Sequence, residues 1–307
     1  MAHWIDDDTN KEYIQRLRSL LSEDDIPVFI FLGAGLSFGV DRGRAVFERF
    51  EYDDNARFPS WPQLIHRMKQ VLLSNPVLQP FEDSVKQFFE KESALDCAEL
   101  FRHYTQGPNY WDFLNRQFET KPDDIRRLTP SHYALTRLPV KRMFTTNYDE
   151  LIETAYMKVG LQLRVSSSSN DFMDYRAIRD THHLIKLHGT IAHPDTIVLT
   201  RSDYAKSRHE RTEMFRYLTD QFEYASFLFV GFSLLDPNFN ILFDDARYAR
   251  KGKNPVSFVV QARKDPVRES YLGSLGVNAI TLDHWDQLPS FLTAIHPDTE
   301  LASLTIY

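Results

Sequence analysis

Residues 26–37 read I-P-V-F-I-F-L-G-A-G-L-S, and this stretch decides the expected fold. The apolar run at residues 28–32 predicts a strand that is buried on both faces, as in a parallel sheet. Gly33 and Gly35 end this strand, and glycine allows both a tight turn and the close approach of a ligand. A helix that opens after Leu36 would direct its free N–H groups to the same point. These three parts together form the first unit of a dinucleotide-binding fold.

The glycine motif alone is weak evidence for a bound nucleotide. Phe38 stands where the third glycine of G-x-G-x-x-G belongs, so the dehydrogenase fingerprint is not met. A tight turn from strand to helix without any ligand explains G-A-G equally well. The decision between the two therefore depends on the rest of the chain.

Composition restricts the class of protein. With 307 residues and 42% hydrophobic content, the chain is long enough to bury a large core. A net charge of −7 with dispersed acidic residues argues against direct binding of nucleic acid. The acidic N-terminus and the lack of a long apolar run predict a cytoplasmic protein without a membrane segment. The single cysteine, Cys97, excludes an internal disulfide and a cysteine-rich zinc module.

A long helical stretch follows the glycine motif. A helix is expected from Asn10, before the first strand. Residues 41–57 are polar and charged, which indicates a loop or mobile cover near the ligand or, equally, an exposed helix. Only helical patterns come next, and the first of these helices has Ser60 at its N-cap position. We therefore expect residues 41–138 to be an all-helical insertion within a single domain that covers residues 1–307.

Strands and helices then alternate to the end of the chain. Strands are expected at residues 141–146, 183–187, 197–199, 226–230, 256–260 and 277–282, and helices at residues 147–156 and 210–224. This alternation predicts an α/β fold with a Rossmann-like, mainly parallel sheet and helices on both faces. Ligands of such sheets bind beyond the carboxyl ends of the strands.

Four of these strands end in small or polar residues, which would line one crevice. The four segments are Gly33-Ala34-Gly35-Leu36-Ser37, Thr146-Asn147-Tyr148-Asp149, His188-Gly189 and Gly231-Phe232-Ser233. In this order they resemble the sirtuin superfamily, whose members carry G-A-G-x-S, T/Q-N-x-D, H-G and a later G-x-S. The resemblance covers most of residues 26–285.

The chain also departs from the protein-deacylating sirtuins. Those enzymes follow H-G with two C-x-x-C pairs that hold zinc, whereas no cysteine follows His188-Gly189 here, so no zinc ribbon forms. The I-P-x-F-R segment of deacylases is missing after Ser37, which leaves the lid over the nicotinamide unassigned. Three phrases resemble instead the zinc-free sirtuin-like domains of bacterial anti-phage defence proteins, which consume NAD: P-S-W-P-Q-L-I at residue 59, I-V-L-T-x-x-D-Y at residue 197 and G-F-S-L-L-D-P-N at residue 231.

The resemblance implies roles for the residues at the strand ends. His188 and Asn147 would be catalytic: His188 as the base, and Asn147 as the group that holds the water or the ribose. Asp149 would bind the nicotinamide carboxamide. The pyrophosphate would lie in a cradle of Gly33, Ala34, Gly35 and Ser37, and the adenosine side would contact Gly231 and Ser233. Because the leaving pyridinium is already cationic, the reaction needs no carboxylic acid to protonate it.

Each assignment has a structural alternative. A histidine followed by glycine at a strand end is also typical of a core histidine before a turn. Asn147 and Ser233 are good helix N-caps, and Asp149 suits the first turn of a helix. Strand alternation places His183 and His188 on opposite faces, so we expect no metal site.

The sequence thus predicts an NAD glycohydrolase that cleaves NAD to nicotinamide and ADP-ribose, with NAD as substrate and no zinc. Its expected role is to deplete NAD in anti-phage defence. One alternative is NAD-dependent protein deacylation, which the missing zinc module disfavours, and a second is a non-catalytic sensor of NAD or ADP-ribose. Because an unrestrained NAD hydrolase would poison its own cell, we expect a homo-oligomer. The resemblance also suggests a separately encoded ATPase or helicase-type defence partner.

Overall fold

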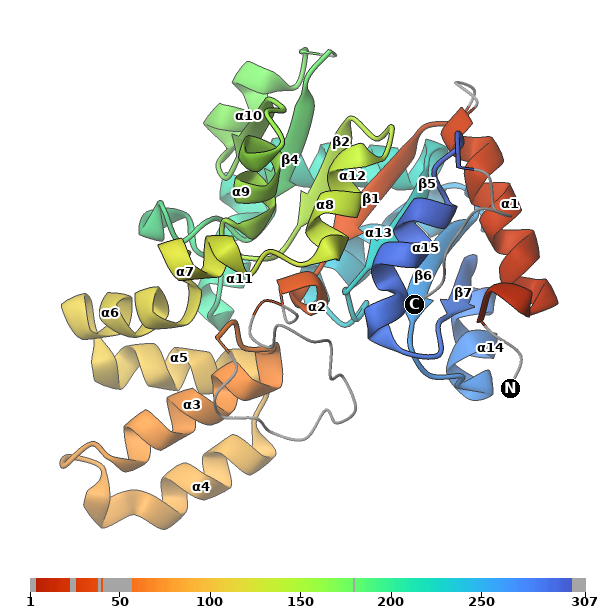
Figure 1. Ribbon diagram of the computed structural model, residues 1–307. Helices are drawn as coiled ribbons and strands as arrows, with labels where there is room; N and C mark the ends of the chain where they lie inside the picture. Colours follow the sequence, from red (N-terminus) through yellow and green to blue (C-terminus); the bar gives the residue numbers. More distant parts are fainter. Residues whose placement is uncertain (1–3, 23–25, 38–39, 41–56, 179, 300–307) are drawn as a thin grey trace.

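The computed structural model describes residues 4–22, 26–37, 40, 57–178 and 180–299 (Figure 1). One seven-stranded sheet organises them, in the order β3-β4-β2-β1-β5-β6-β7, and every neighbouring pair is parallel. The strands are β1 (Val28–Leu32), β2 (Arg142–Thr145), β3 (Leu163–Ser166), β4 (His182–Lys186), β5 (Ser226–Val230), β6 (Ser257–Gln261) and β7 (Val277–Thr281). The predicted Rossmann-like α/β fold is confirmed.

Strand β1 lies at the centre of the sheet, with β2 on one side and β5 on the other. Its last residue, Leu32, is in register with Thr145 of β2 and with Val230 of β5. Phe31 and Leu32 face opposite layers and are both fully buried. A strand with two parallel neighbours and helices over both faces has no polar side, and this explains the unbroken apolar run.

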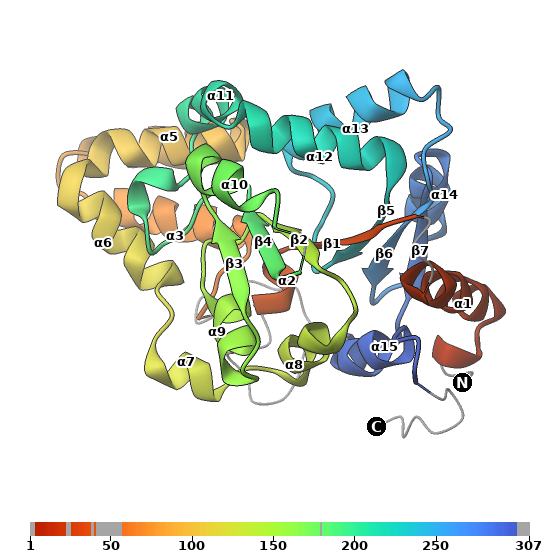
Figure 2. The same ribbon diagram turned by 90° about the horizontal axis from the view of Figure 1, so that it is seen from above.

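Helices cover both faces of the sheet (Figure 2). One layer shares a core with the Ile30 and Leu32 face and contains α1 (Asp8–Ser22), α8 (Pro130–Arg137), α9 (Leu151–Lys158) and α15 (Leu288–Ala294). The other layer shares a phenylalanine-rich core with the Phe29 and Phe31 face and contains α10 (Ser169–Tyr175), α12 (Thr212–Tyr224), α13 (Pro237–Ala249) and α14 (Pro266–Ser274).

A separate group of helices lies beside the carboxyl ends of β1 and β2, at the lower left of Figure 1. It comprises α3 (Trp61–Leu73), α4 (Glu82–Lys91), α5 (Ala94–Thr105) and α6 (Gly107–Phe118), with α7 (Pro122–Arg126) next to it. Its core includes Tyr148, Ile191 and Leu199 from the sheet's loops, and Arg102 of α5 binds Asp203 of α11 (Arg201–Glu210) at 2.6 Å. This helical group therefore borders the crevice that the sequence predicts.

The residues described between 57 and 138 form helices and loops without a strand. The last of these helices, α8, packs against α9 and α15 in the sheet's own layer. The limits of the helical insertion, at residues 41 and 138, stay a prediction. The polar stretch expected to cover the ligand lies outside the described residues except for its last member, Arg57.

Several expected elements differ in the structure. Residues 197–199 are buried but form no strand. Ile197 and Leu199 belong to the core of the helical group, and Val198 N donates to the His188 carbonyl rather than to a strand of the sheet. The helix expected at residues 210–224 is α12, which begins two residues later, at Thr212, because Glu210 ends α11 and Arg211 lies between the two helices. Strand β3 was not expected, because as an edge strand it is only partly buried and lacks an apolar run.

Two helix starts also differ. Helix α2 (Ala34–Ser37) begins inside the glycine turn rather than after Leu36. Helix α9 begins at Leu151, not at residue 147, and Asn147 does not cap it. Four single turns of 3-10 helix complete the described elements: η1 (Trp4–Asp6), η3 (Gln79–Phe81), η4 (Pro194–Thr196) and η5 (Trp285–Gln287). Among the described residues no helix is long and apolar enough to cross a membrane.

Candidate active site

Gly33, Gly35 and Gly231 meet where β1 and β5 end, and we call this arrangement the glycine contact. Gly35 N donates to the Gly231 carbonyl at 2.9 Å. A Cβ on Gly33 would lie 2.4 Å from that carbonyl oxygen, and one on Gly231 would lie 2.6 Å from Leu36 N. The predicted reason for these glycines was close approach to a ligand. The structure adds another reason: the two strand ends approach each other too closely for any side chain.

We expect Gly231→Ala to lower the free energy of unfolding by about 2–5 kcal/mol, since the positive φ costs an alanine about 1–2 kcal/mol and the clash adds about 1–3 kcal/mol. Gly252→Ala is the matched control, because Gly252 also has a positive φ, 71°, but nothing lies within 4 Å of its added Cβ. Denaturant unfolding of both variants separates the two costs. If both variants lose the same free energy of unfolding, the glycine contact accommodates a side chain without an energetic cost.

Ser37, Asn147 and Asp149 form a buried polar cluster next to the glycine contact. Asn147 Nδ2 donates to the Gly33 carbonyl at 3.1 Å and to Ser37 Oγ at 3.0 Å. Ser37 Oγ in turn donates to Asp149 Oδ2 at 2.8 Å. All three residues are 6% exposed or less. Three residues that the sequence assigned to one ligand are thus joined by direct hydrogen bonds.

Hydrogen bonds to the backbone fix this cluster in place. Thr145 Oγ1 at the end of β2 donates to the Leu32 carbonyl and accepts from Asn147 N, each at 3.0 Å. Asp149 Oδ1 accepts from Leu151 N at 3.2 Å, so this carboxylate supports the first turn of α9, as one alternative proposed. Burial raises the pKa of the Asp149 carboxyl, while Lys186 and the Ser37 hydroxyl oppose that shift.

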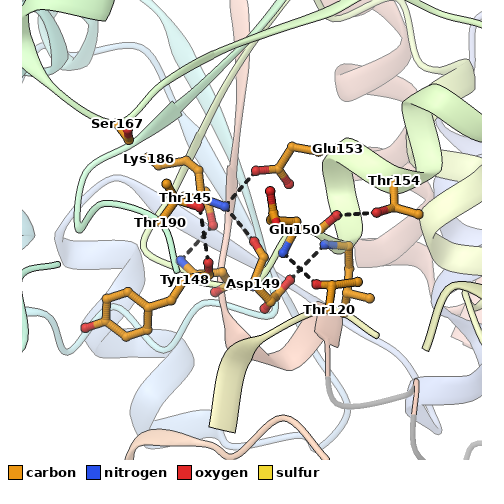
Figure 3. Close-up of polar contacts among 12 residues, drawn as sticks. Thr120, Thr145, Tyr148, Asp149, Glu150, Glu153, Thr154, Ser167, Lys186 and Thr190 are labelled. Atoms are coloured by element: carbon orange, nitrogen blue, oxygen red, sulfur yellow. Dashed lines mark hydrogen bonds and ion pairs between the residues drawn. The ribbon is translucent and has the colours of Figure 1, made fainter. Parts of the chain in front are cut away.

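Lys186, the last residue of β4, reaches Asp149 of the cluster (Figure 3). Its side chain is 1% exposed, and Nζ lies 2.7 Å from Glu153 Oε1. Nζ also donates to the Asp149 carbonyl at 2.5 Å. The close-up shows this amine between α9 and the segment that carries Tyr148 and Asp149. A buried cation therefore ties the predicted binding segment to the helix that follows it.

His188 belongs to a second buried group of side chains, just after the end of the neighbouring strand β4. The residue is 4% exposed, and its Nε2 lies 3.4 Å from Asp236 Oδ2. The ring of Tyr204 meets the imidazole edge-on, with centroids 5.1 Å apart. Burial lowers the pKa of His188, Asp236 opposes the shift, and Arg211 adds to it. The imidazole is therefore neutral at neutral pH and able to accept a proton.

The sheet register relates His188 to Asn147. Thr145 of β2 pairs with Lys186 of β4. Asn147 follows Thr145 by two residues and His188 follows Lys186 by two residues, so both predicted catalytic residues lie just beyond this pair. A further link runs through Val198, whose carbonyl accepts from Tyr148 Oη at 2.7 Å while its N–H donates to the His188 carbonyl at 2.9 Å. The two polar groups thus share one edge of the sheet.

The tight turn after His188 requires a glycine at position 189. Gly189 has a φ of 82°, and a Cβ there would lie 2.0 Å from the Thr196 carbonyl oxygen. Arg211, which lies between α11 and α12, donates to the carbonyls of Leu187 and Thr196 on either side of this turn. The turn therefore holds the backbone of His188 from both sides.

The remaining predicted residues lie around these groups. Ala34 begins α2 next to the glycine contact. Ser233 is exposed, and its carbonyl accepts from Arg268 at 3.0 Å. It does not cap α13, because Asp236 is the N-cap and accepts from Phe239 N at 2.8 Å.

Sequence reasoning missed three residues that support the site: Lys186, Tyr204 and Asp236. A charged residue ending an otherwise apolar strand was the available signal for Lys186. Tyr204 and Asp236 stand in the D-Y and D-P-N phrases, which served to support the family resemblance. Among the described residues, no group of three histidine, cysteine, aspartate or glutamate side chains has the arrangement to hold a metal ion.

Comparison with known proteins adds to this geometry. A family profile described as a SIR2-like domain matches residues 141–280. The match begins one residue before β2 and ends at the second-last residue of β7. Residues 141–280 are therefore similar to a SIR2-like domain. The strand ends with Asn147, His188 and Gly231 all lie inside the matched range, while β1 and its glycines precede it.

Several relatives are similar to the chain over more residues than the matched range 141–280. It is 26% identical over 286 residues to "NAD(+) hydrolase ThsA" of Bacillus cereus (strain MSX-D12), an alignment with 87% of this chain and 53% of the relative. For the protein of the same name from Enterococcus faecium the values are 26% identity, 74% of this chain and 41% of the relative. "Defense-associated sirtuin 2" of Bacillus subtilis is 23% identical over 70% of this chain and 20% of its own length. The chain thus spans about half the length of the Bacillus cereus relative.

Proposed function

We propose that the protein hydrolyses NAD to nicotinamide and ADP-ribose. The observation that carries the proposal is the pair of buried groups at one edge of the sheet: Asn147 bound to Ser37 and the glycine contact, and a neutral His188 beside them. The similarity to a SIR2-like domain and the names of the relatives support NAD as the substrate. In this proposal the cytoplasmic enzyme depletes NAD during anti-phage defence.

The reaction needs a base and a group that orients the reactants. The bond between the ribose C1′ and the nicotinamide nitrogen breaks, and its electron pair neutralises the departing pyridinium. Water adds to C1′, and its proton passes to His188. Asn147 holds the water or the ribose next to the developing oxocarbenium ion. Asp149 binds the carboxamide, Gly33, Ala34, Gly35 and Ser37 hold the pyrophosphate, and Gly231 and Ser233 lie on the adenosine side.

Purified protein incubated with NAD, with and without an acetylated peptide, tests this function. Nicotinamide release without peptide, with ADP-ribose formed in equal amount, is the expected result. Release only with the peptide would instead support a deacylase, and binding of NAD without release would support a sensor. The proposed reaction uses no zinc, so we expect a chelator to leave the rate unchanged.

We further propose that assembly controls the activity. The side chains of Ser37, Asn147, Asp149 and His188 are all buried, so NAD reaches them only after the residues that cover them move. A shift from 1:99 to 99:1 in the active population needs only about 5.5 kcal/mol of differential binding, which one interface of ordinary size supplies. We propose a homo-oligomer, with a separately encoded ATPase or helicase-type protein as a second possible source of control.

Light scattering combined with NAD assays over a wide dilution series measures this control. We expect a species larger than one chain, and a specific activity that changes as it dissociates. A monomer with constant activity at every concentration would exclude control by self-association.

A further inference from the structure

We propose that Asp236 is a positioning residue for His188: it orients the imidazole and stabilises the imidazolium that forms when His188 accepts a proton. Tyr204 and the first turn of α13 hold the Asp236 carboxylate in place for this task. The inference rests on the proposed function, since it assigns the partner of the base in that reaction.

The carboxylate of Asp236 is held from two directions. Its Oδ1 accepts from Phe239 N at 2.8 Å, as the N-cap of α13. Its Oδ2 accepts from Tyr204 Oη at 2.6 Å and lies 3.4 Å from His188 Nε2. Both oxygens are therefore engaged, and the side chain has little freedom to leave the imidazole.

The position of this carboxylate, 3.4 Å from Nε2, favours one ring nitrogen of His188 as the carrier of the proton. A neutral imidazole next to a carboxylate places its N–H on the near nitrogen, here Nε2. Nδ1 is then the acceptor, and it is the atom that would take the proton from water. When it does, the new positive charge lies next to Asp236 rather than alone in a buried site.

Three charged or titratable groups surround His188. Asp236 raises the pKa of the imidazole and Arg211 lowers it, while burial lowers it most. Tyr204 remains protonated, because burial and the adjacent Asp236 both raise the pKa of its hydroxyl. It therefore acts as a donor to the carboxylate and moderates the negative charge that faces the imidazole.

The sharpest test compares two aspartates with the same structural task. Asp236 and Asp265 each precede a proline and cap the following helix, α13 and α14. Asparagine keeps the capping oxygen in both places. We expect Asp236→Asn to lower kcat by at least about 10-fold with little change in KM, because the amide donates to Nε2 and reverses the tautomer. We expect Asp265→Asn to stay within about 2-fold of the unaltered protein, since Asp265 lies outside the site.

The pH profile separates positioning from simple structural support. Activity is lost as the pH falls and His188 becomes protonated, so the acid limb follows its pKa. Removing the charge of Asp236 lowers that pKa, and the acid limb of Asp236→Asn moves to lower pH. Tyr204→Phe removes a donor from the carboxylate, which strengthens its attraction for the imidazolium and moves the limb to higher pH.

A second measurement does not depend on activity. NMR titration of ¹³C-labelled histidines follows the His188 resonance, assigned by its absence from His188→Ala. We expect the His188 pKa to be lower in Asp236→Asn and unchanged in Asp265→Asn. If the unaltered protein releases no nicotinamide, the proposed function fails while this titration still tests the pairing. An active protein in which Asp236→Asn matches Asp265→Asn in rate, acid limb and His188 pKa would overturn the inference.

Discussion

His188→Ala is expected to lower nicotinamide release from NAD by at least about 10²-fold, the usual scale for the loss of a general base. Alanine removes a buried imidazole whose pKa burial lowers and whose Nε2 lies 3.4 Å from the Asp236 carboxylate. A steady-state assay of nicotinamide, run with thermal melts of both proteins, measures the loss and checks the fold.

His193→Ala is the control for this variant. His193 follows His188 in the same connection but is exposed, so we expect its activity within about 2-fold of the unaltered protein. A folded His188→Ala variant that keeps its activity would remove His188 from the mechanism. It would leave the fold and the sensor alternative intact.

Lys186→Met is expected to lower the free energy of unfolding by about 3 kcal/mol or more, the cost of removing one partner from a buried ion pair. The lysine is 1% exposed and binds both Glu153 and the Asp149 carbonyl. Without it the carbonyl loses its donor and Glu153 loses its cation. Urea unfolding followed by circular dichroism measures the change.

Two further variants show whether the ion pair is the cause. Adding Glu153→Gln to Lys186→Met removes the unpaired charge, and we expect the double variant to regain at least about 1 kcal/mol. Lys86→Met breaks a surface pair, Lys86–Glu82 at 2.5 Å, in which both side chains are about half exposed. We expect Lys86→Met to lower the free energy of unfolding far less than Lys186→Met, because solvent screens an exposed pair. If Lys186→Met and Lys86→Met lower the free energy of unfolding equally, burial of the ion pair does not affect its contribution to stability.

Most strands could be predicted from the sequence, and the edge strand β7 is among them. β1 and β5 occupy the residues expected of them, because apolar side chains on both faces leave a clear signal. The edge strand β3 reads L-R-V-S and left no such signal. The apolar residues 197–199 had the signal but no neighbouring strand to pair with.

The candidate site could also be predicted only in part. Residues that follow buried strands, such as Asn147 and His188, could be placed at one edge because topology alone brings strand ends together. The pairing of His188 with Asp236 could not, because the two residues belong to different elements far apart in the chain. The roles of Asn147, His188 and the other predicted site residues stay predictions.

The central place of β1 has a consequence for how the protein is made. Val28 pairs with Ser226, about 200 residues later in the chain. At about 5–20 residues per second, a ribosome needs roughly 10–40 s between these two strands. During that time the apolar β1 has emerged without β5, one of its two neighbours, and an exposed apolar strand is prone to aggregate. The yield of folded protein should therefore depend on how long this strand stays exposed during synthesis.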